Sequence, residues 1–106
     1  MLVLLNACNS SVDESTAWQK INDGALLVDV RTPGEHQQGH LEGALLIPHT
    51  EVAARIAEFG DDKSRPVVLY CKSGGRAGKA QKVLEENGFT HVVNAGGYRD
   101  LVASKP

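Results

Sequence analysis

Cys71 is the residue whose type and setting most clearly predict chemistry in this sequence. It ends the apolar, β-favouring run of residues 67–70. The segment that follows it is Lys72-Ser73-Gly74-Gly75-Arg76. Two adjacent glycines allow the backbone to turn tightly and to present its N–H groups at close range. Such N–H groups, at the start of a helix, stabilise an anion. Because the thiolate is the nucleophilic form of cysteine, we interpret Cys71 as a nucleophile rather than as an inert core residue.

Basic residues are concentrated around this cysteine. The 106-residue chain has 11 Lys and Arg against 13 Asp and Glu, which argues against a general nucleic-acid binder. Six of the basic residues, and no acidic one, lie between Lys63 and Lys82, whereas the rest of the chain has 5 basic and 13 acidic residues. This distribution predicts a small anionic substrate. For Lys79 and Lys82 a solvated helix face is the alternative interpretation.

The elements that must position Cys71 follow from the apolar pattern. Residues 67–70 predict a buried strand of a parallel sheet, and a helix follows from Arg76 to a cap at Gly88. Further strands are predicted over 25–30, 44–47 and 91–94, and further helices over 15–23, 33–38, 50–59 and 98–103. The first of these helices has Ser15 or Thr16 as its expected cap, with Trp18 and Ile21 facing inward. This alternation predicts an α/β fold: an open parallel sheet of four to five strands, any fifth near Val12, with helices on both faces.

In such sheets ligands bind beyond the carboxyl ends of the strands, where further polar residues are expected. We interpret Arg31 as one half of a structural ion pair with Glu35, with direct substrate contact as the alternative. Asp29 is expected to cap backbone N–H groups, and His40 to anchor a loop through a hydrogen bond. The histidines show no metal-site spacing, and no nucleotide fingerprint is present. We therefore expect no metal and no organic cofactor.

Three motifs, in order, resemble those of the rhodaneses, a family of sulfurtransferases. The first runs from Leu27 to Ala44, contains Asp29-Val30-Arg31, Glu35 and Gly39-His40, and is followed by Ile47-Pro48. The second is Cys71, four residues and then Arg76; the third is Ala95-Gly96-Gly97-Tyr98. The resemblance covers roughly residues 15–103 and is nearest to small bacterial rhodaneses of the phage-shock type. Where the family often has a tryptophan after the third motif, this chain has Leu101.

The resemblance implies a thiosulfate sulfurtransferase that works through a persulfide on Cys71. The backbone N–H groups of residues 72–76 would hold the transferred sulfur, with Arg76 completing the site. The implied partners are a small anionic sulfur donor and a thiophilic acceptor such as cyanide or a thiol. No nucleic acid is implied, and we expect a monomer.

Two alternatives stay open at this point. A cysteine-dependent phosphatase or arsenate reductase also uses a cysteine–arginine loop, but phosphatases of similar architecture separate the pair by five residues instead of four. A non-catalytic sulfur-carrier or interaction module is the other alternative, and the intact Cys71 and Arg76 weigh against it.

The beginning of the chain differs from the rest in composition. Residues 1–5 are apolar, Asn6-Ala7-Cys8 follows, and a polar run extends to Thr16. The pattern resembles the cleavage site of bacterial lipoprotein signals, although it lacks a basic start and its apolar stretch is short. We predict a leader or tether over residues 1–12 and a catalytic domain over residues 13–106. If Cys8 is lipidated the protein is periplasmic or anchored to the envelope, and otherwise cytoplasmic; both cysteines are expected to be reduced.

Overall fold

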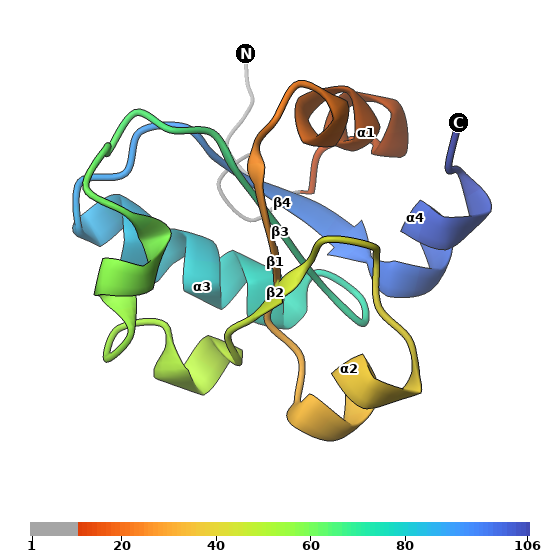
Figure 1. Ribbon diagram of the computed structural model, residues 1–106, viewed down its shortest axis with the longest axis horizontal. Helices are drawn as coiled ribbons and strands as arrows, with labels where there is room; N and C mark the ends of the chain where they lie inside the picture. Colours follow the sequence, from red (N-terminus) through yellow and green to blue (C-terminus); the bar gives the residue numbers. More distant parts are fainter. Residues whose placement is uncertain (1–10) are drawn as a thin grey trace, which may run out of the picture.

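The computed structural model describes residues 11–106, which form one parallel sheet with helices on both faces (Figure 1). The strand order is β2-β1-β3-β4. The strands are β1 (Leu26–Asp29), β2 (Leu45–Leu46), β3 (Val67–Cys71) and β4 (Val92–Gly97). The predicted α/β class is therefore confirmed, with four strands in the described part of the chain.

The central strand β3 shows why the sheet is covered on both faces. All five of its residues are buried. Val67, Leu69 and Cys71 face one hydrophobic cluster, while Val68 and Tyr70 face the other. Since side chains alternate along a strand, a continuous apolar run fits only a strand that is packed on both sides.

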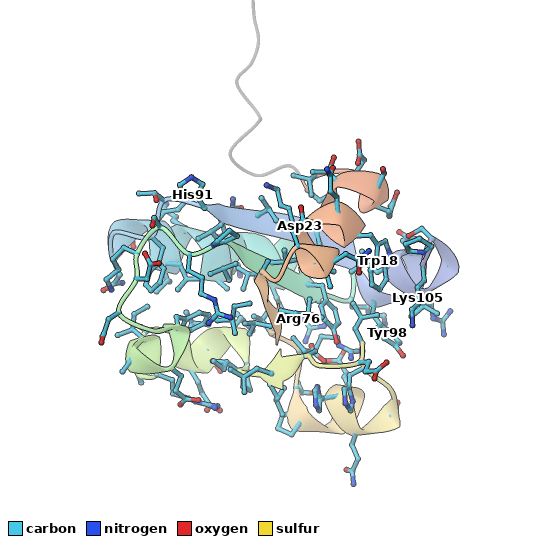
Figure 2. All side chains as sticks on the ribbon, turned by 45° about the horizontal axis from the view of Figure 1, so that its top comes forward. Trp18, Asp23, Arg76, His91, Tyr98 and Lys105 are labelled. Atoms are coloured by element: carbon cyan, nitrogen blue, oxygen red, sulfur yellow. The ribbon has the colours of Figure 1, made fainter. Side chains whose placement is uncertain are left out.

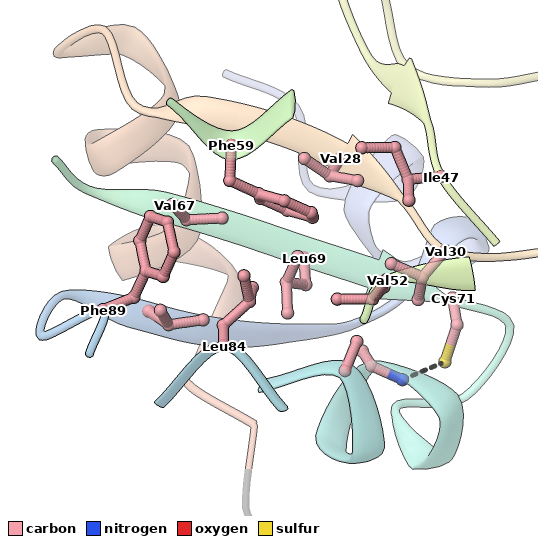
Figure 3. Packing of buried hydrophobic residues seen from close by; sticks show 13 residues of the cluster. Val28, Val30, Ile47, Val52, Phe59, Val67, Leu69, Cys71, Leu84 and Phe89 are labelled. Atoms are coloured by element: carbon pink, nitrogen blue, oxygen red, sulfur yellow. Dashed lines mark hydrogen bonds between the residues drawn. The ribbon is translucent and has the colours of Figure 1, made fainter. Parts of the chain in front are cut away.

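Helix α3 (Gly75–Glu86) and two short 3₁₀ helices, η2 (His49–Glu51) and η3 (Ile56–Phe59), cover the first face. Figure 3 shows Phe59, Leu84 and Phe89 packed over the residues that β3 directs to this side. Each large apolar side chain buried in this way contributes on the order of 1.5–3 kcal/mol.

Helices α1 (Glu14–Asn22) and α4 (Tyr98–Ala103) cover the second face. Trp18 lies between them in Figure 2, and its indole N–H donates to the Leu101 carbonyl at 3.0 Å. Leu101, which stands where the family often has tryptophan, is fully buried. Helix α2 (Pro33–Gln38) follows β1 and lies apart from both layers (Figure 1).

Two local predictions were wrong. The expected helix over 50–59 is instead the two 3₁₀ helices joined by a turn. Arg55 pairs with Glu51 and Glu58 at spacings that a helix also allows, but its guanidinium donates as well to the Leu46 carbonyl of β2. This contact attaches the segment to the edge of the sheet. Helix α1 is capped by Asp13, whose carboxylate accepts the Thr16 N–H at 2.8 Å, and not by Ser15 or Thr16.

No fifth strand forms within residues 11–106, but Val12 is attached to the edge strand β4. Its N–H donates to the Asn94 carbonyl at 2.8 Å, and its side chain packs partly against the cluster beneath α1 and α4. The predicted leader over residues 1–12 otherwise lies outside the described residues and stays a prediction.

Candidate functional site

Cys71 ends β3 with its sulfur directed at the beginning of α3. The sulfur accepts hydrogen bonds from the Gly74 N–H at 2.9 Å and from the Ala77 N–H at 3.4 Å, the second of which is drawn in Figure 3. Gly74 has φ +99°, a left-handed conformation that favours glycine. Both N–H groups favour a negative charge on sulfur.

Only one of these two donors comes from the predicted range of residues 72–76. Gly74 belongs to it, whereas Ala77 lies in the first turn of α3 and was missed. The first N–H groups of any helix lack partners within that helix, so the start of α3 was the signal that pointed to Ala77. Ser73 is exposed at the outside of the loop, and Gly75 begins the helix.

Arg76 binds Glu35 instead of the sulfur. Its two terminal nitrogens donate to the two carboxylate oxygens of Glu35 at 2.7 and 3.0 Å. The predicted Arg31–Glu35 pair is therefore wrong. That prediction relied on the four-residue spacing of Arg31 and Glu35, whereas the actual partner, Arg76, lies 41 residues from Glu35 in the sequence. The hydrogen bonds from Arg76, with smaller contributions from Thr32, lower the pKa of Glu35 from its usual 4.5 to about 2. The predicted part of Arg76 in substrate binding stays a prediction.

Glu35 also organises the turn that precedes it. Its carboxylate accepts the Thr32 N–H at 3.0 Å, while the Thr32 hydroxyl accepts the Glu35 N–H at 3.2 Å, so the two residues form a capping box at the start of α2. Helix α2 is thus joined to the Cys71 loop through one carboxylate.

Arg31 pairs with Asp29. The buried carboxylate of Asp29 accepts the Arg31 N–H at 3.0 Å, as expected for a cap, and two guanidinium nitrogens at 2.9 and 2.7 Å. Burial alone would raise the pKa of Asp29, but the hydrogen bonds from Arg31 and His36 together hold it below its usual value. The guanidinium also donates to the Gly39 carbonyl at 2.7 Å and lies 4.5 Å from the ring centre of Tyr98.

The histidines of the first motif stabilise the same region. His40 Nδ1 lies 2.8 Å from the His36 carbonyl, so the expected hydrogen-bonded anchor is confirmed. His36 was not expected to take part, yet its ring stacks on that of His40 at 3.7 Å and its Nδ1 lies 2.9 Å from Asp29. The Tyr70 hydroxyl, also unforeseen, donates to Asp29 at 3.2 Å.

A pocket of about 350 Å³ opens beside the loop. Arg31, Glu35, Lys72, Tyr98 and Arg99 contribute to its lining. Figure 2 shows Arg76 and Tyr98 on the side of the molecule where α2 lies. Lys72 and Arg99 are exposed and form no ion pair within residues 11–106, so this pocket is suited to an anion.

No group of three or more His, Cys, Asp or Glu side chains in the described part of the chain is placed to hold a metal ion. Across residues 11–106, none of the helices combines the length and the apolar character needed to span a membrane. Cys8 lies outside these residues.

Comparisons with known proteins agree with this geometry. The model of the rhodanese-like domain family matches residues 13–104. The chain is 46% identical over 78 residues to the thiosulfate sulfurtransferase PspE of Escherichia coli, which covers 74% of this chain and 75% of that protein. It is 37% identical over 90 residues to a sulfurtransferase of Allochromatium vinosum, covering 83% and 82% of the two chains.

Solved structures give the same result. A rhodanese with anions from E. coli matches with a TM-score of 0.68 at 45% identity and covers 73% of this chain and 91% of its own. A protein from Staphylococcus saprophyticus, SSP1007, matches with a TM-score of 0.75 at 30% identity over 91% of this chain and 96% of its own. The family match spans nearly all of the described residues and includes Cys71 and its loop, and the chain therefore belongs to the rhodanese-like domain family.

Proposed function

We propose that this protein is a thiosulfate sulfurtransferase that carries the transferred sulfur as a persulfide on Cys71. The observation that carries the proposal is the placement of the Cys71 sulfur at the end of β3, where the Gly74 and Ala77 N–H groups donate to it. The resemblance to relatives named as sulfurtransferases supports it.

The donor step balances without proton transfer. The Cys71 thiolate attacks the outer sulfur of thiosulfate, the bond between the two sulfurs of thiosulfate breaks, and sulfite leaves with the electron pair. The product is a persulfide anion on Cys71, so the total charge is the same on both sides. No residue of the site has to act as a general acid, in keeping with the structural contacts that occupy His40 and Asp29.

In the acceptor step Cys71 is the leaving group instead of the nucleophile. Cyanide or a thiolate attacks the terminal sulfur of the persulfide, the new bond forms on that sulfur, and Cys71 leaves as a thiolate. The exposed Lys72 and Arg99 beside the loop attract anionic donors and acceptors to this step.

The size of the loop favours sulfur transfer over phosphoryl transfer. A persulfide places its second sulfur about 2 Å beyond the first, within reach of a narrow ring of N–H groups. A phosphoryl group has three equatorial oxygens that each need a donor. The further residue found in phosphatase loops would add up to about 3.5 Å of chain, which is the scale of that difference.

The location of the protein is part of the same proposal. We propose that Cys8 is lipidated and holds the domain in the periplasm or at the envelope, with the catalytic domain acting as a monomer. Metabolic labelling with a fatty acid, compared between the wild type and Cys8→Ser, tests the anchor, and sedimentation tests the monomer.

The function is tested by turnover. The wild type should transfer sulfur from thiosulfate to cyanide and should fail to hydrolyse an aryl phosphate. Cys71→Ser should abolish the transfer with the fold intact, because a hydroxyl is not ionised at neutral pH, while Cys8→Ser should retain it. Hydrolysis of the aryl phosphate by the wild type without sulfur transfer would overturn the proposal.

A further inference from the structure

Asn94 is a buried polar residue of β4 whose side chain reaches the Cys71 loop. It is 1% exposed, and its Nδ2 donates to the Gly74 carbonyl at 2.9 Å. Its Oδ1 accepts the Gly96 N–H at 2.9 Å. A carbonyl can only accept and a backbone N–H can only donate, so these two partners fix the orientation of the amide. Both of its polar atoms are therefore satisfied by backbone groups.

The residue that Asn94 holds is the one that donates to the nucleophile. The N–H of Gly74 points at the Cys71 sulfur, and the carbonyl of the same residue accepts from Asn94 and from the Gly78 N–H, each at 2.9 Å. A glycine has many backbone conformations available to it. The hydrogen bond from Asn94, which lies on a strand, to the Gly74 carbonyl therefore selects the backbone conformation in which the Gly74 N–H points at the Cys71 sulfur.

The other half of the amide stabilises an irregularity in β4. Leu69 lies opposite Asn94 and Cys71 opposite Gly97, so two steps along β3 correspond to three along β4. Gly96, inside this bulge, has φ +84° and donates to Asn94. Because a bulge redirects the end of a strand, it brings β4 against the beginning of the loop.

We propose that Asn94 is a positioning residue for sulfur transfer, which acts through Gly74 to hold a hydrogen-bond donor against the anionic sulfur of Cys71. It does not touch the substrate. The inference deepens the proposed function, because an anionic sulfur is both the nucleophile of the donor step and the product of the acceptor step.

Asn94→Ser separates this role from support of the bulge. A serine hydroxyl can still accept the N–H two residues on, as in a serine turn, but it is too short to donate to Gly74. Asn94→Asp is the second variant, since its carboxylate can accept from Gly96 but cannot donate to a carbonyl. Asn87→Ser is the matched control, because Asn87 is an exposed residue at the end of α3 whose amide donates to Val83.

All measurements use the full chain with Cys8→Ser, so that Cys71 is the one thiol that can be alkylated. The first is the pH profile of alkylation by iodoacetamide, a neutral reagent that detects the thiolate. The second is the rate of persulfide formation with thiosulfate, and thermal unfolding is the third. Asn94→Ser and Asn94→Asp should move the alkylation profile to higher pH and slow persulfide formation about 5–10-fold, the scale of the one neutral hydrogen bond to Gly74 that they remove. Asn87→Ser should change neither reaction.

Alkylation profiles that coincide with that of the wild type in both Asn94 variants, whatever their melting temperatures, would overturn the inference and leave Asn94 as a stabiliser of β4. Absence of persulfide in the wild type would instead contradict the proposed function. The alkylation profiles would still decide the inference in that case, so the two failures are distinguishable.

Discussion

At the scale of single residues, the Arg76–Glu35 ion pair offsets the charge of one of the two basic residues in the Cys71 loop, the other being the exposed Lys72. Both charges are present at neutral pH, and the bidentate contact at 2.7 and 3.0 Å balances one against the other. The N–H groups of Gly74 and Ala77 donate directly to the Cys71 sulfur, whereas the hydrogen bonds of the Arg76 guanidinium go to Glu35. Arg76 instead attaches the beginning of α3 to α2.

The pH dependence of this pair gives the first prediction for a single residue. Hydrogen bonds from Arg76, and to a smaller extent from Thr32, lower the pKa of Glu35 from 4.5 to about 2. These contacts of the carboxylate therefore stabilise the folded state fully above pH 4.5, and the contribution is lost as the pH falls toward 2. Glu35→Gln should therefore melt at a lower temperature than the wild type near neutral pH, and the gap should close toward pH 2. The Glu35 side chain is 29% exposed, so added salt should narrow the gap.

Thermal unfolding of both proteins across this pH range is the measurement. Glu42→Gln serves as control, because Glu42 is exposed and makes no ion pair within the described residues. A gap that persists unchanged down to pH 2 would show that the carboxylate of Glu35 contributes no charge-dependent stability.

At the scale of elements, the end of β4 limits where the loop can lie. Gly97 faces the start of the loop so closely that a Cβ there would overlap the Lys72 carbonyl. Its φ is −103°, so the requirement for glycine is one of space and not of backbone conformation. The close approach of these two backbones follows from the bulge at Gly96.

Gly97→Ala should therefore displace the loop and slow persulfide formation by about fivefold or more, since forced overpacking costs roughly 1–3 kcal/mol. Gly34→Ala is the matched control, because a Cβ there would meet nothing nearer than 4.0 Å. Persulfide formation followed by rapid mixing with thiosulfate compares the two. Equal rates of persulfide formation for Gly97→Ala and the wild type would contradict the prediction that a Cβ at this position disturbs the Cys71 loop.

The elements differ in how well the sequence predicted them. The strand over 67–70 and the helix from Arg76 were predictable, because a short run rich in β-branched residues favours a buried strand and a helical repeat of apolar residues favours a helix. The end of β4 was not, since Asn94 and two glycines discourage a strand and the bulge that accommodates them depends on β3. Within the first motif, the Asp29 cap and the His40 hydrogen bond could be predicted because their partners are close in sequence. The Arg31–Glu35 pair was wrong, because Glu35 and Arg76 meet only in the folded chain.

At the scale of the whole molecule, three separate elements hold the Cys71 loop. Helix α2 binds Arg76 through Glu35, β4 binds Gly74 through Asn94, and α3 continues directly from the loop. These contacts come from segments far apart in the sequence, so the loop acquires its geometry only when the sheet is complete. The reactivity of Cys71 should therefore report on the global fold.

The segment before α1 gives the prediction that concerns the domain boundary. A chain beginning at Asp13 lacks the Val12 N–H bond to Asn94 and the partial packing of Val12. Its stability should fall by about 1–2 kcal/mol relative to a chain beginning at Ser11, roughly 4–8 °C in melting temperature per kcal/mol, with turnover retained at 25 °C. Equal melting temperatures would place Val12 outside the cooperative unit.

The central claim is that Cys71 becomes a persulfide. The most direct measurement is the intact mass of the protein after incubation with thiosulfate and removal of excess donor, with sulfite assayed in the same sample. The account predicts one added sulfur atom and one sulfite per chain in the wild type and in Cys8→Ser, loss of the added mass on treatment with cyanide, and no addition in Cys71→Ser. An unchanged mass in the wild type, or the same addition in Cys71→Ser, would contradict it.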